Sequence, residues 1–254
     1  MEESALNNPF KPAIVIPVYN HEDAIESTLK QVLEYGYPAV LVDDGCGAKC
    51  REVLEKLAEK YRDQVYLVQL ATNSGKGGAV KAGMRFLLDQ GFSHALQVDA
   101  DGQHNISDLP IFIQAAEKEQ ESLICGFPIY DHSVPKHRYY CRYFSHVWVW
   151  INTLSFSIKD SMCGFRVYPL VKICKLIDRA SCGNRMSFDT EVVVRWVWSG
   201  HKIKNMPTKV IYPENGVSHF NAIKDNVLIS WMHTRLFFGM LWRSPALLWN
   251  KRHG

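Results

Sequence analysis

The stretch Leu96-Gln-Val-Asp-Ala-Asp-Gly102 decides the fold class of this sequence. A short apolar run ends in two carboxylates that are separated by one residue and followed by glycine. The same pattern, an apolar run that ends in polar residues, occurs at 13–20 and at 39–45. Each run has the length of a buried strand, and each is followed by apolar residues at helical spacing. The repeated pattern therefore predicts strand–helix–strand units.

Strands and helices are predicted to alternate over the first half of the chain. Strands separated by helices of 10–15 residues indicate a parallel sheet, which binds its ligands beyond the carboxyl ends of its strands. Polar clusters at 19–20, 43–44 and 99–101 fall at those ends, so we expect a binding site at this edge. The expected strands are 13–19, 39–42, 65–70, 94–98 and 123–125, and the expected helices are 25–33, 53–61, 77–90 and 109–116.

The second half of the chain is less regular. A polar loop is expected at 131–138, and the uncharged segment 143–158 is expected to be a buried helix or, as the alternative, an interfacial segment. That uncharged segment is 16 residues long, and a membrane span needs about 20 apolar residues. Later elements are predicted as a loop at 160–166 leading into a helix near 171–177, a loop at 181–185, a helix at 188–198 and a strand at 203–211.

The composition excludes several classes of protein. Of the 254 residues, 47% are hydrophobic and 22% are charged, which is typical of a globular chain and excludes a disordered one. Seven scattered cysteines predict free thiols. Cys46 and Cys50 are not matched by a second pair of cysteines, so they do not indicate a zinc site. Residues 1–8 have no apolar segment of signal-peptide type, so we expect a cytoplasmic protein.

The C-terminal segment 221–254 differs from the rest of the chain. It carries five Lys or Arg residues and one Asp, together with several tryptophans, whereas the first 220 residues have no basic patch of nucleic-acid type. We expect a basic amphipathic helix that Pro245 ends or kinks. Two roles stay open: a helix packed on the protein, or one lying at the surface of an anionic membrane.

Asp99 and Asp101 are the first candidate site residues. Two carboxylates beyond a strand can share Mg²⁺ or Mn²⁺ with a diphosphate, although an exposed acidic loop gives the same pattern. Asp44 can accept a hydrogen bond from a nucleobase N–H or simply form a turn with Gly45. Tyr19, after Pro17, can stack on a base or belong to the core. Each of these patterns is weak by itself.

Two further motifs carry charged groups. The segment 73–78 is glycine-rich, lacks the spacing of a P-loop, and can offer backbone N–H groups and Lys76 to an anion. Asp160 and Arg166 suit a general base and an anion clamp, or else a structural salt bridge between the two. His219 follows a turn at 216–218, where a histidine is usually only polar surface.

Taken in order, six motifs resemble glycosyltransferase family 2 with the GT-A fold, most closely its dolichyl- and polyprenyl-phosphate sugar transferase branch. The resemblance covers residues 11–220 and leaves 221–254 as a helical tail. It implies an α/β fold with a mostly parallel, Rossmann-like sheet and helices on both faces. The motifs are Pro17-Val-Tyr-Asn20, Val42-Asp-Asp-Gly45, Asn73-x-Gly-Lys-Gly77, Val98-Asp-Ala-Asp-Gly102, Asp160-x-x-x-Gly-Phe-Arg166 and Phe188-x-x-Glu191.

The resemblance also implies roles for individual residues. Pro17, Tyr19 and Asp44 would line the nucleobase pocket, and Lys76 would lie near the base and ribose. Asp99 would meet the ribose or the metal, Asp101 would bind Mg²⁺ or Mn²⁺, and Gln103 and His219 would assist. Asp160 matches the catalytic acid–base position and Arg166 a phosphate contact.

The implied activity is an inverting transfer from a UDP- or GDP-sugar to a lipid or lipid-linked acceptor, at the inner face of a membrane. The chain departs from the family at Cys46, where serine is usual, and at Gly126-Phe-Pro-Ile129, where the polyprenyl branch often has an arginine. A polyprenyl-phosphate sugar synthase is the more specific alternative. A non-catalytic nucleotide-binding or membrane-scaffold protein is the rival interpretation of another class.

Overall fold

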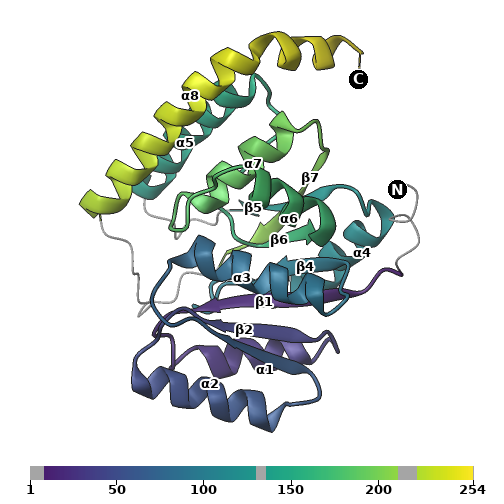
Figure 1. Cartoon of the computed structure of the whole chain (residues 1–254), viewed down its shortest axis with the longest axis vertical. Helices are drawn as coiled ribbons and strands as arrows, with labels where there is room; N and C mark the ends of the chain where they lie inside the picture. The colour runs from purple at the N-terminus through teal and green to yellow at the C-terminus, as the bar shows by residue number, and fades with distance from the viewer. Residues whose placement is uncertain (1–8, 130–135, 211–221, 254) are drawn as a thin grey trace.

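The computed structural model describes residues 9–129, 136–210 and 222–253. Their strands and helices alternate as the sequence predicts through the first 125 residues (Figure 1). The elements in chain order are β1 (Pro12–Val18), α1 (Ile25–Leu33), β2 (Ala39–Asp43), α2 (Ala48–Lys60), β3 (Val65–Gln69), α3 (Lys76–Asp89), β4 (His94–Gln97), the 3-10 turn η2 (Ile106–Asp108), α4 (Leu109–Lys118), β5 (Leu123–Ile129), α5 (Lys136–Thr153), β6 (Arg166–Pro169), α6 (Leu170–Arg179), α7 (Phe188–Trp198), β7 (Ile203–Lys209) and α8 (Ala222–His253).

The strands form one seven-stranded sheet in the order β3-β2-β1-β4-β6-β5-β7. β1 pairs in parallel with β2 and with β4, and β5 pairs in parallel with β7. β6 runs antiparallel to both of its neighbours, β4 and β5. This strand lies where the sequence predicts a loop running directly into a helix, so that prediction is wrong for residues 166–169.

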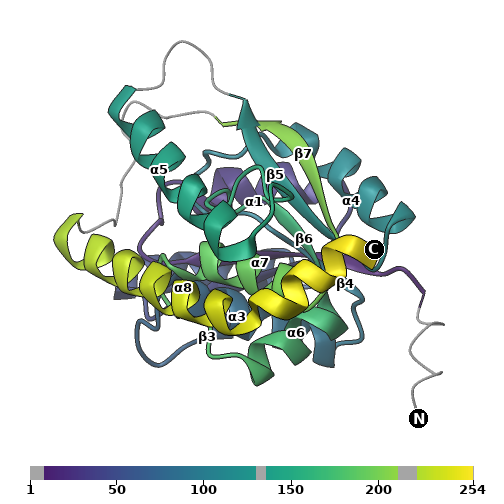
Figure 2. The same cartoon turned by 90° about the horizontal axis from the view of Figure 1, so that it is seen from above.

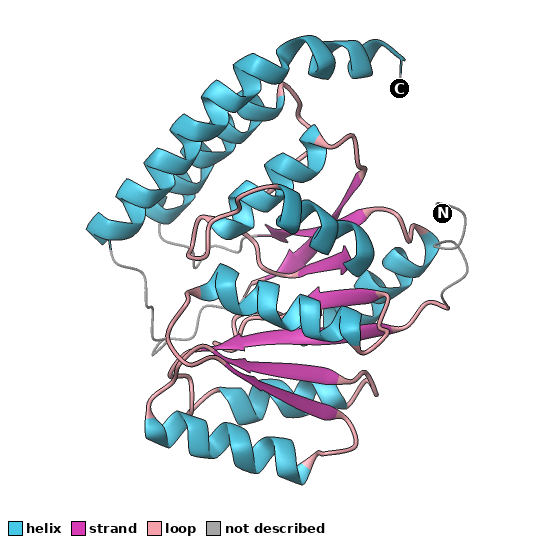
Figure 3. Ribbon diagram, in the orientation of Figure 1, coloured by secondary structure: helices cyan, strands magenta, loops and turns pink. Residues whose placement is uncertain are grey.

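Two apolar clusters cover the two faces of the sheet. Apolar side chains of α1, α2 and α4 pack on one face, and those of α3, α6 and α7 pack on the other. Figure 3 shows the sheet lying between these helices. The central strands are buried on both faces: all five residues of β2 are buried, as are six of the seven in β1. Continuous burial of this kind is typical of parallel strands between helical layers, and it confirms the predicted fold class.

The helices α5 and α8 lie side by side outside this α/β unit (Figure 2). Val149 of α5 and Met232 and Leu236 of α8 join the cluster beneath α7. The expectation that segment 143–158 forms a buried helix is only partly right. Tyr143, Phe144 and Phe156 are exposed, and the helix already begins at Lys136, inside the expected loop.

The helix α8 is apolar on two opposite sides. Its buried side packs on α5 and α7 and consists of Met232, Leu236, Met240 and Leu247. A second stripe, at spacings of four and seven residues, faces away from the protein: Val227, Trp231, Phe238, Trp242 and Trp249, all exposed. Pro245 does not end the helix, which continues to His253 with a change of axis near its end (Figure 1). Within the described residues, no helix combines the length and apolarity that crossing a membrane requires.

Candidate active site

The loops that follow β1 and β2 are tied together at the carboxyl edge of the sheet. Asn20 has a positive φ of 52°. Its backbone N–H donates to Cys46 Sγ at 3.3 Å, and its side-chain oxygen accepts the Gly47 N–H at 2.8 Å. Cys46 Sγ in turn donates to the Val18 carbonyl. Cys46 therefore serves as a hydrogen-bonding group between the two loops, a role that the serine usual at this position would also fill.

Pro17 and Tyr19 differ in exposure. Pro17 is buried within β1, opposite Val42, and Tyr19 is half-buried beyond the end of the strand. Of these two side chains, Tyr19 is the one with surface left for stacking on a ligand. The nucleobase role of both remains a prediction.

Asp44 is buried and holds the glycine-rich loop in place. Its carboxylate accepts hydrogen bonds from the backbone N–H and hydroxyl of Ser74, at 2.7 and 2.8 Å, and from the Gly75 N–H at 2.9 Å. Gly45, with φ of 70°, allows this contact, since a Cβ there would lie 2.5 Å from the Asn73 nitrogen. The loop donors that the sequence suggested for an anion therefore bind a carboxylate of the protein.

Lys76 links two acids at the bottom of the site. Its ammonium group lies 2.8 Å from Asp99 Oδ2 and 2.9 Å from Asp189 Oδ2. Burial alone would raise the pKa of Asp99, but Lys76 and the nearby His104 outweigh it and hold that pKa well below the usual range. Burial alone would also lower the pKa of Lys76, and the two acids raise it instead. Both groups are therefore charged at neutral pH.

Gly164 allows this cluster to pack closely. A Cβ at this position would lie 2.8 Å from Asp99 Oδ2 and 2.9 Å from Lys76 Nζ. The Gly-Phe-Arg motif therefore contributes its glycine to the site, because any side chain there would displace the Lys76–Asp99 pair.

Asp101 and Gln103 follow on the same loop and are half-buried. Asp101 Oδ1 accepts the Gln103 N–H at 3.0 Å. Next to them, His104 is buried, with Nε2 3.2 Å from Asp99 Oδ2, and neither of its ring nitrogens has a hydrogen-bond partner in the described part of the chain. Asp101 is thus a carboxylate at the surface of the site, whereas Asp99 is paired with Lys76 inside it.

The carboxylate pair fits a hard cation only if a ligand completes the coordination. No group of three or more His, Cys, Asp or Glu side chains that could hold a metal occurs among the described residues. The oxygens of Asp99 and Asp101 are the ligand type that Mg²⁺ and Mn²⁺ prefer, and such sites usually rely on substrate phosphates. His219, the other expected metal-linked residue, lies outside the described residues.

Asp160 is buried, 3% exposed, and fully engaged. Arg142 of α5 donates to both carboxylate oxygens, at 2.6 and 2.7 Å, and the Met162 and Cys163 N–H groups donate to Oδ1. His146 Nε2 lies 3.2 Å from Oδ2. Burial alone would raise the pKa of Asp160, but His146 and Arg142 outweigh it and lower that pKa well below its usual range. The alternative of a salt bridge with Arg166 is wrong, because the ionic partner is Arg142.

Arg166, expected to contact the donor phosphates, is fully buried in β6. Its guanidinium donates to the Asp189 carbonyl at 2.6 Å and to the Ser161 carbonyl at 2.8 Å. The side chain therefore has no exposed surface that a phosphate could contact. Its hydrogen bonds instead connect helix α7 with the loop that follows α5.

Sequence reasoning missed Asp189, His104, Arg142 and His146 as contributors to the site. Asp189 lies within the quoted Phe188-x-x-Glu191 motif, so the signal was present. Arg142 and His146 are spaced by four residues and lie on one face of a helix, but nothing in the sequence shows that this face meets Asp160.

Residues 13–185 match the model of glycosyl transferase family 2, so the chain belongs to this family. It is 27% identical to a dolichyl-phosphate beta-glucosyltransferase of Dictyostelium discoideum, over 71% of this chain and 60% of that protein. The chain thus spans about three fifths of that relative's length.

Two solved structures share the fold, which is that of the GT-A glycosyltransferases. One is the Pyrobaculum calidifontis mannosyltransferase PcManGT in complex with GDP-Man and Mn²⁺, with a TM-score of 0.56, 14% identity and coverage of 94% of this chain and 73% of that one. The other is S. aureus TarS in complex with UDP, with a TM-score of 0.56, 15% identity and coverage of 92% and 71%.

Proposed function

We propose that this glycosyltransferase moves a sugar from a UDP- or GDP-sugar to a lipid phosphate at a membrane surface, with inversion at the anomeric carbon. The observation that carries the donor side is the cluster of Asp44, Lys76, Asp99 and Asp101 at the carboxyl edge of the sheet. Tyr19 and Asp44 would border the nucleobase, and Lys76 with Asp99 the ribose. A relative named as a dolichyl-phosphate beta-glucosyltransferase, and structural neighbours in complex with UDP or with GDP-Man, support this assignment.

Asp101, with Asp99 and Gln103, would hold Mg²⁺ or Mn²⁺ against the donor diphosphate, and His219 is a further candidate ligand. Such an ion stabilises the negative charge that develops on the departing nucleoside diphosphate. Lys76 adds a fixed positive charge nearby, because its two acid partners keep it protonated. Arg166 supports the site from within the sheet and has no donor contact in this proposal.

The environment of Asp160 favours a phosphate acceptor over a hydroxyl. A general base works best when its pKa lies near the operating pH, whereas Asp160 is bound by Arg142 and has a strongly lowered pKa. A phosphate monoester is already ionised near pH 7 and needs little help from a base. Asp160 would then orient Arg142 and His146.

Donor binding can be tested by thermal shift with a panel of nucleotide sugars in the presence of Mn²⁺. A ligand at 100 times its dissociation constant stabilises the folded state by about 2.7 kcal/mol. We expect UDP- or GDP-sugars to raise the melting temperature and adenine nucleotides to leave it unchanged. Equal shifts with every nucleotide, or none with any, would contradict the donor assignment.

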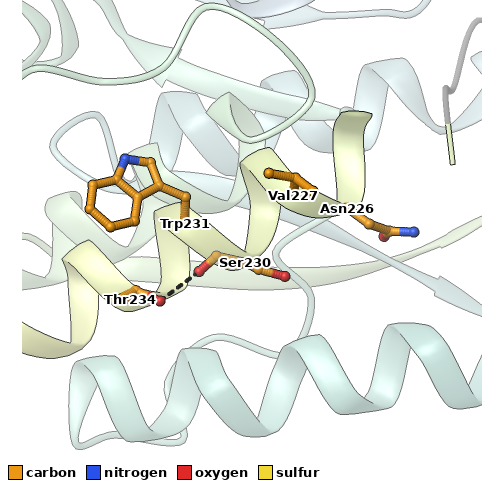
Figure 4. Close-up of a pocket in the computed structure, with 5 residues that line it drawn as sticks. All are labelled: Asn226, Val227, Ser230, Trp231 and Thr234. Atoms are coloured by element: carbon orange, nitrogen blue, oxygen red, sulfur yellow. Dashed lines mark hydrogen bonds between the residues drawn. The ribbon is translucent and has the colours of Figure 1, made fainter. Parts of the chain in front are cut away.

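The outward stripe on α8 would place the enzyme on a membrane. Trp231 and Trp242 are 60% and 85% exposed, and tryptophan with nearby basic residues suits the interface of anionic lipid. Figure 4 shows Trp231 beside an open apolar hollow whose lining residues all come from this helix. Both roles expected for the tail are then filled by one helix, with one side packed and the other side on lipid. The expected location is the cytoplasmic face of the membrane.

Vesicle sedimentation tests this surface. We expect wild-type binding to rise with the fraction of anionic lipid and to fall with salt, because basic residues add electrostatic attraction. The double variant Trp231→Gln/Trp242→Gln should lose most of this binding while keeping the wild-type melting temperature. Ile111→Gln, an exposed apolar residue of α4, is the matched control. If the double variant binds like wild type, the stripe is not the membrane surface.

A further inference from the structure

Glu191 of α7 is a fully buried acid that the site described above does not use. Its carboxylate accepts hydrogen bonds from three segments of the chain. Arg195 donates to Oε1 at 2.8 and 3.1 Å, the Gly183 N–H donates to Oε2 at 2.9 Å, and Arg235 of α8 lies 3.3 Å from Oε2. A buried carboxylate is stable in the charged form only with such partners. Glu191 therefore joins α7, the loop before it and α8.

The loop that Glu191 holds, residues 181–187, packs on the glycine-rich loop. Lys81 of α3 donates to the Cys182 carbonyl at 3.0 Å and to the Asn184 side chain. The Asn184 carbonyl accepts the Gly78 N–H at 2.9 Å. A Cβ on Gly75 would lie 2.7 Å from that same carbonyl. The two loops are thus in close backbone contact.

The glycine-rich loop is in turn the one that carries the donor-site groups. Ser74 and Gly75 bind Asp44, and Lys76 binds Asp99. An unbroken series of contacts therefore runs from Arg235 on α8 to the two acids of the donor site. A physical network alone does not show coupling, but it identifies the residues whose removal would reveal it.

We propose that Glu191 is a positioning residue that transmits the docking of α8 to the donor loop, through the backbone of residues 183–185. The proposal rests on the proposed function, because it assigns residues 73–76 to donor binding. The same helix carries the stripe proposed to contact lipid, so the attachment of α8 and the affinity for the donor would be linked. Linkage of this kind works in both directions.

Arg235 is the residue to change, because its side chain is 36% exposed and its loss leaves Glu191 with two partners. We expect Arg235→Ala to weaken UDP or GDP binding about tenfold, within the range usual for coupled sites. The KM for the donor should rise by the same factor with little change in kcat, and Arg235→Lys should restore part of the affinity. Arg85→Ala, which removes an equal charge from an exposed pair with Asp178, should bind nucleotide like wild type.

Hydrogen exchange of the full-length protein supplies a second measurement that does not depend on nucleotide. In Arg235→Ala, amides in 181–187 and 73–78 should exchange faster, while those of β2 and α2 stay unchanged. Exchange and nucleotide affinity that both match wild type, or changes that Arg85→Ala reproduces, would overturn the proposal. If wild-type protein binds neither UDP nor GDP, the donor assignment fails, and the exchange pattern still decides whether α8 holds the loop.

Discussion

Replacing Asp101 with alanine is expected to reduce sugar transfer by about 10³-fold while leaving the melting temperature within a few degrees of wild type. Asp101 is half-buried, and its carboxylate accepts a hydrogen bond from a backbone N–H two residues away, so the fold loses little without it. Under the proposed function the reaction would lose a cation ligand, and a 10³-fold decrease in rate corresponds to about 4 kcal/mol of transition-state stabilisation. Initial rates with saturating donor and Mn²⁺ measure the effect.

Asp63→Ala is the control for this change. Asp63 is an exposed carboxylate in the turn before β3, at the opposite edge of the sheet, and its loss should not alter the rate. Wild-type activity that persists in excess EDTA would contradict the metal role of Asp101. Full activity of the Asp101→Ala variant would contradict this role as well.

Replacing Asp160 with asparagine is expected to destabilise the fold by about 3 kcal/mol, because it removes a buried carboxylate that pairs with the half-buried Arg142. The lowered pKa of Asp160 gives the effect a pH dependence. A carboxyl whose pKa falls on folding stabilises the native state above its unfolded pKa, and that stabilisation is lost as pH falls below about 4. The wild type should therefore lose stability on acidification more steeply than Asp160→Asn, as measured by chemical denaturation at pH 7 and pH 3.

The same variant separates the two roles considered for Asp160. At a temperature where it is folded, Asp160→Asn should not show the 10²–10⁴-fold loss of turnover (about 3–5 kcal/mol) that removal of a general base causes. Asp178→Asn, which breaks an exposed pair, should change stability by less than about 1 kcal/mol. Unchanged stability with a turnover loss of that size would make Asp160 the base after all.

The first half of the molecule could be predicted from the sequence because its signals are local. Each strand there is a continuous apolar run, and site groups lie within two residues of a strand's end, as Asp44 does after β2 and Asp99 after β4. Parallel pairing then brings the carboxyl ends together without further information. The positions of Asp44, Lys76 and Asp99 at one edge follow from this rule.

The remainder depends on contacts between distant segments. β6 has four residues, begins with a buried arginine and ends in proline, so neither length nor pattern indicates a central strand. The partner of Asp160 lies 18 residues earlier, on a helix whose orientation the sequence does not fix. The two apolar sides of α8 likewise obscure its periodicity, because buried and exposed residues are equally apolar.

The central claim, transfer of a sugar from a nucleotide sugar to a lipid phosphate, is tested most directly by measuring nucleoside diphosphate release with and without a polyprenyl phosphate in anionic vesicles. UDP- and GDP-sugars are supplied in turn with Mn²⁺, and the lipid product is followed by mass spectrometry. The account predicts release that requires the lipid phosphate, yields a glycosylated lipid in equal amount and is lost in Asp101→Ala. Release that is the same with the unphosphorylated polyprenol, or no release with any donor, would contradict it.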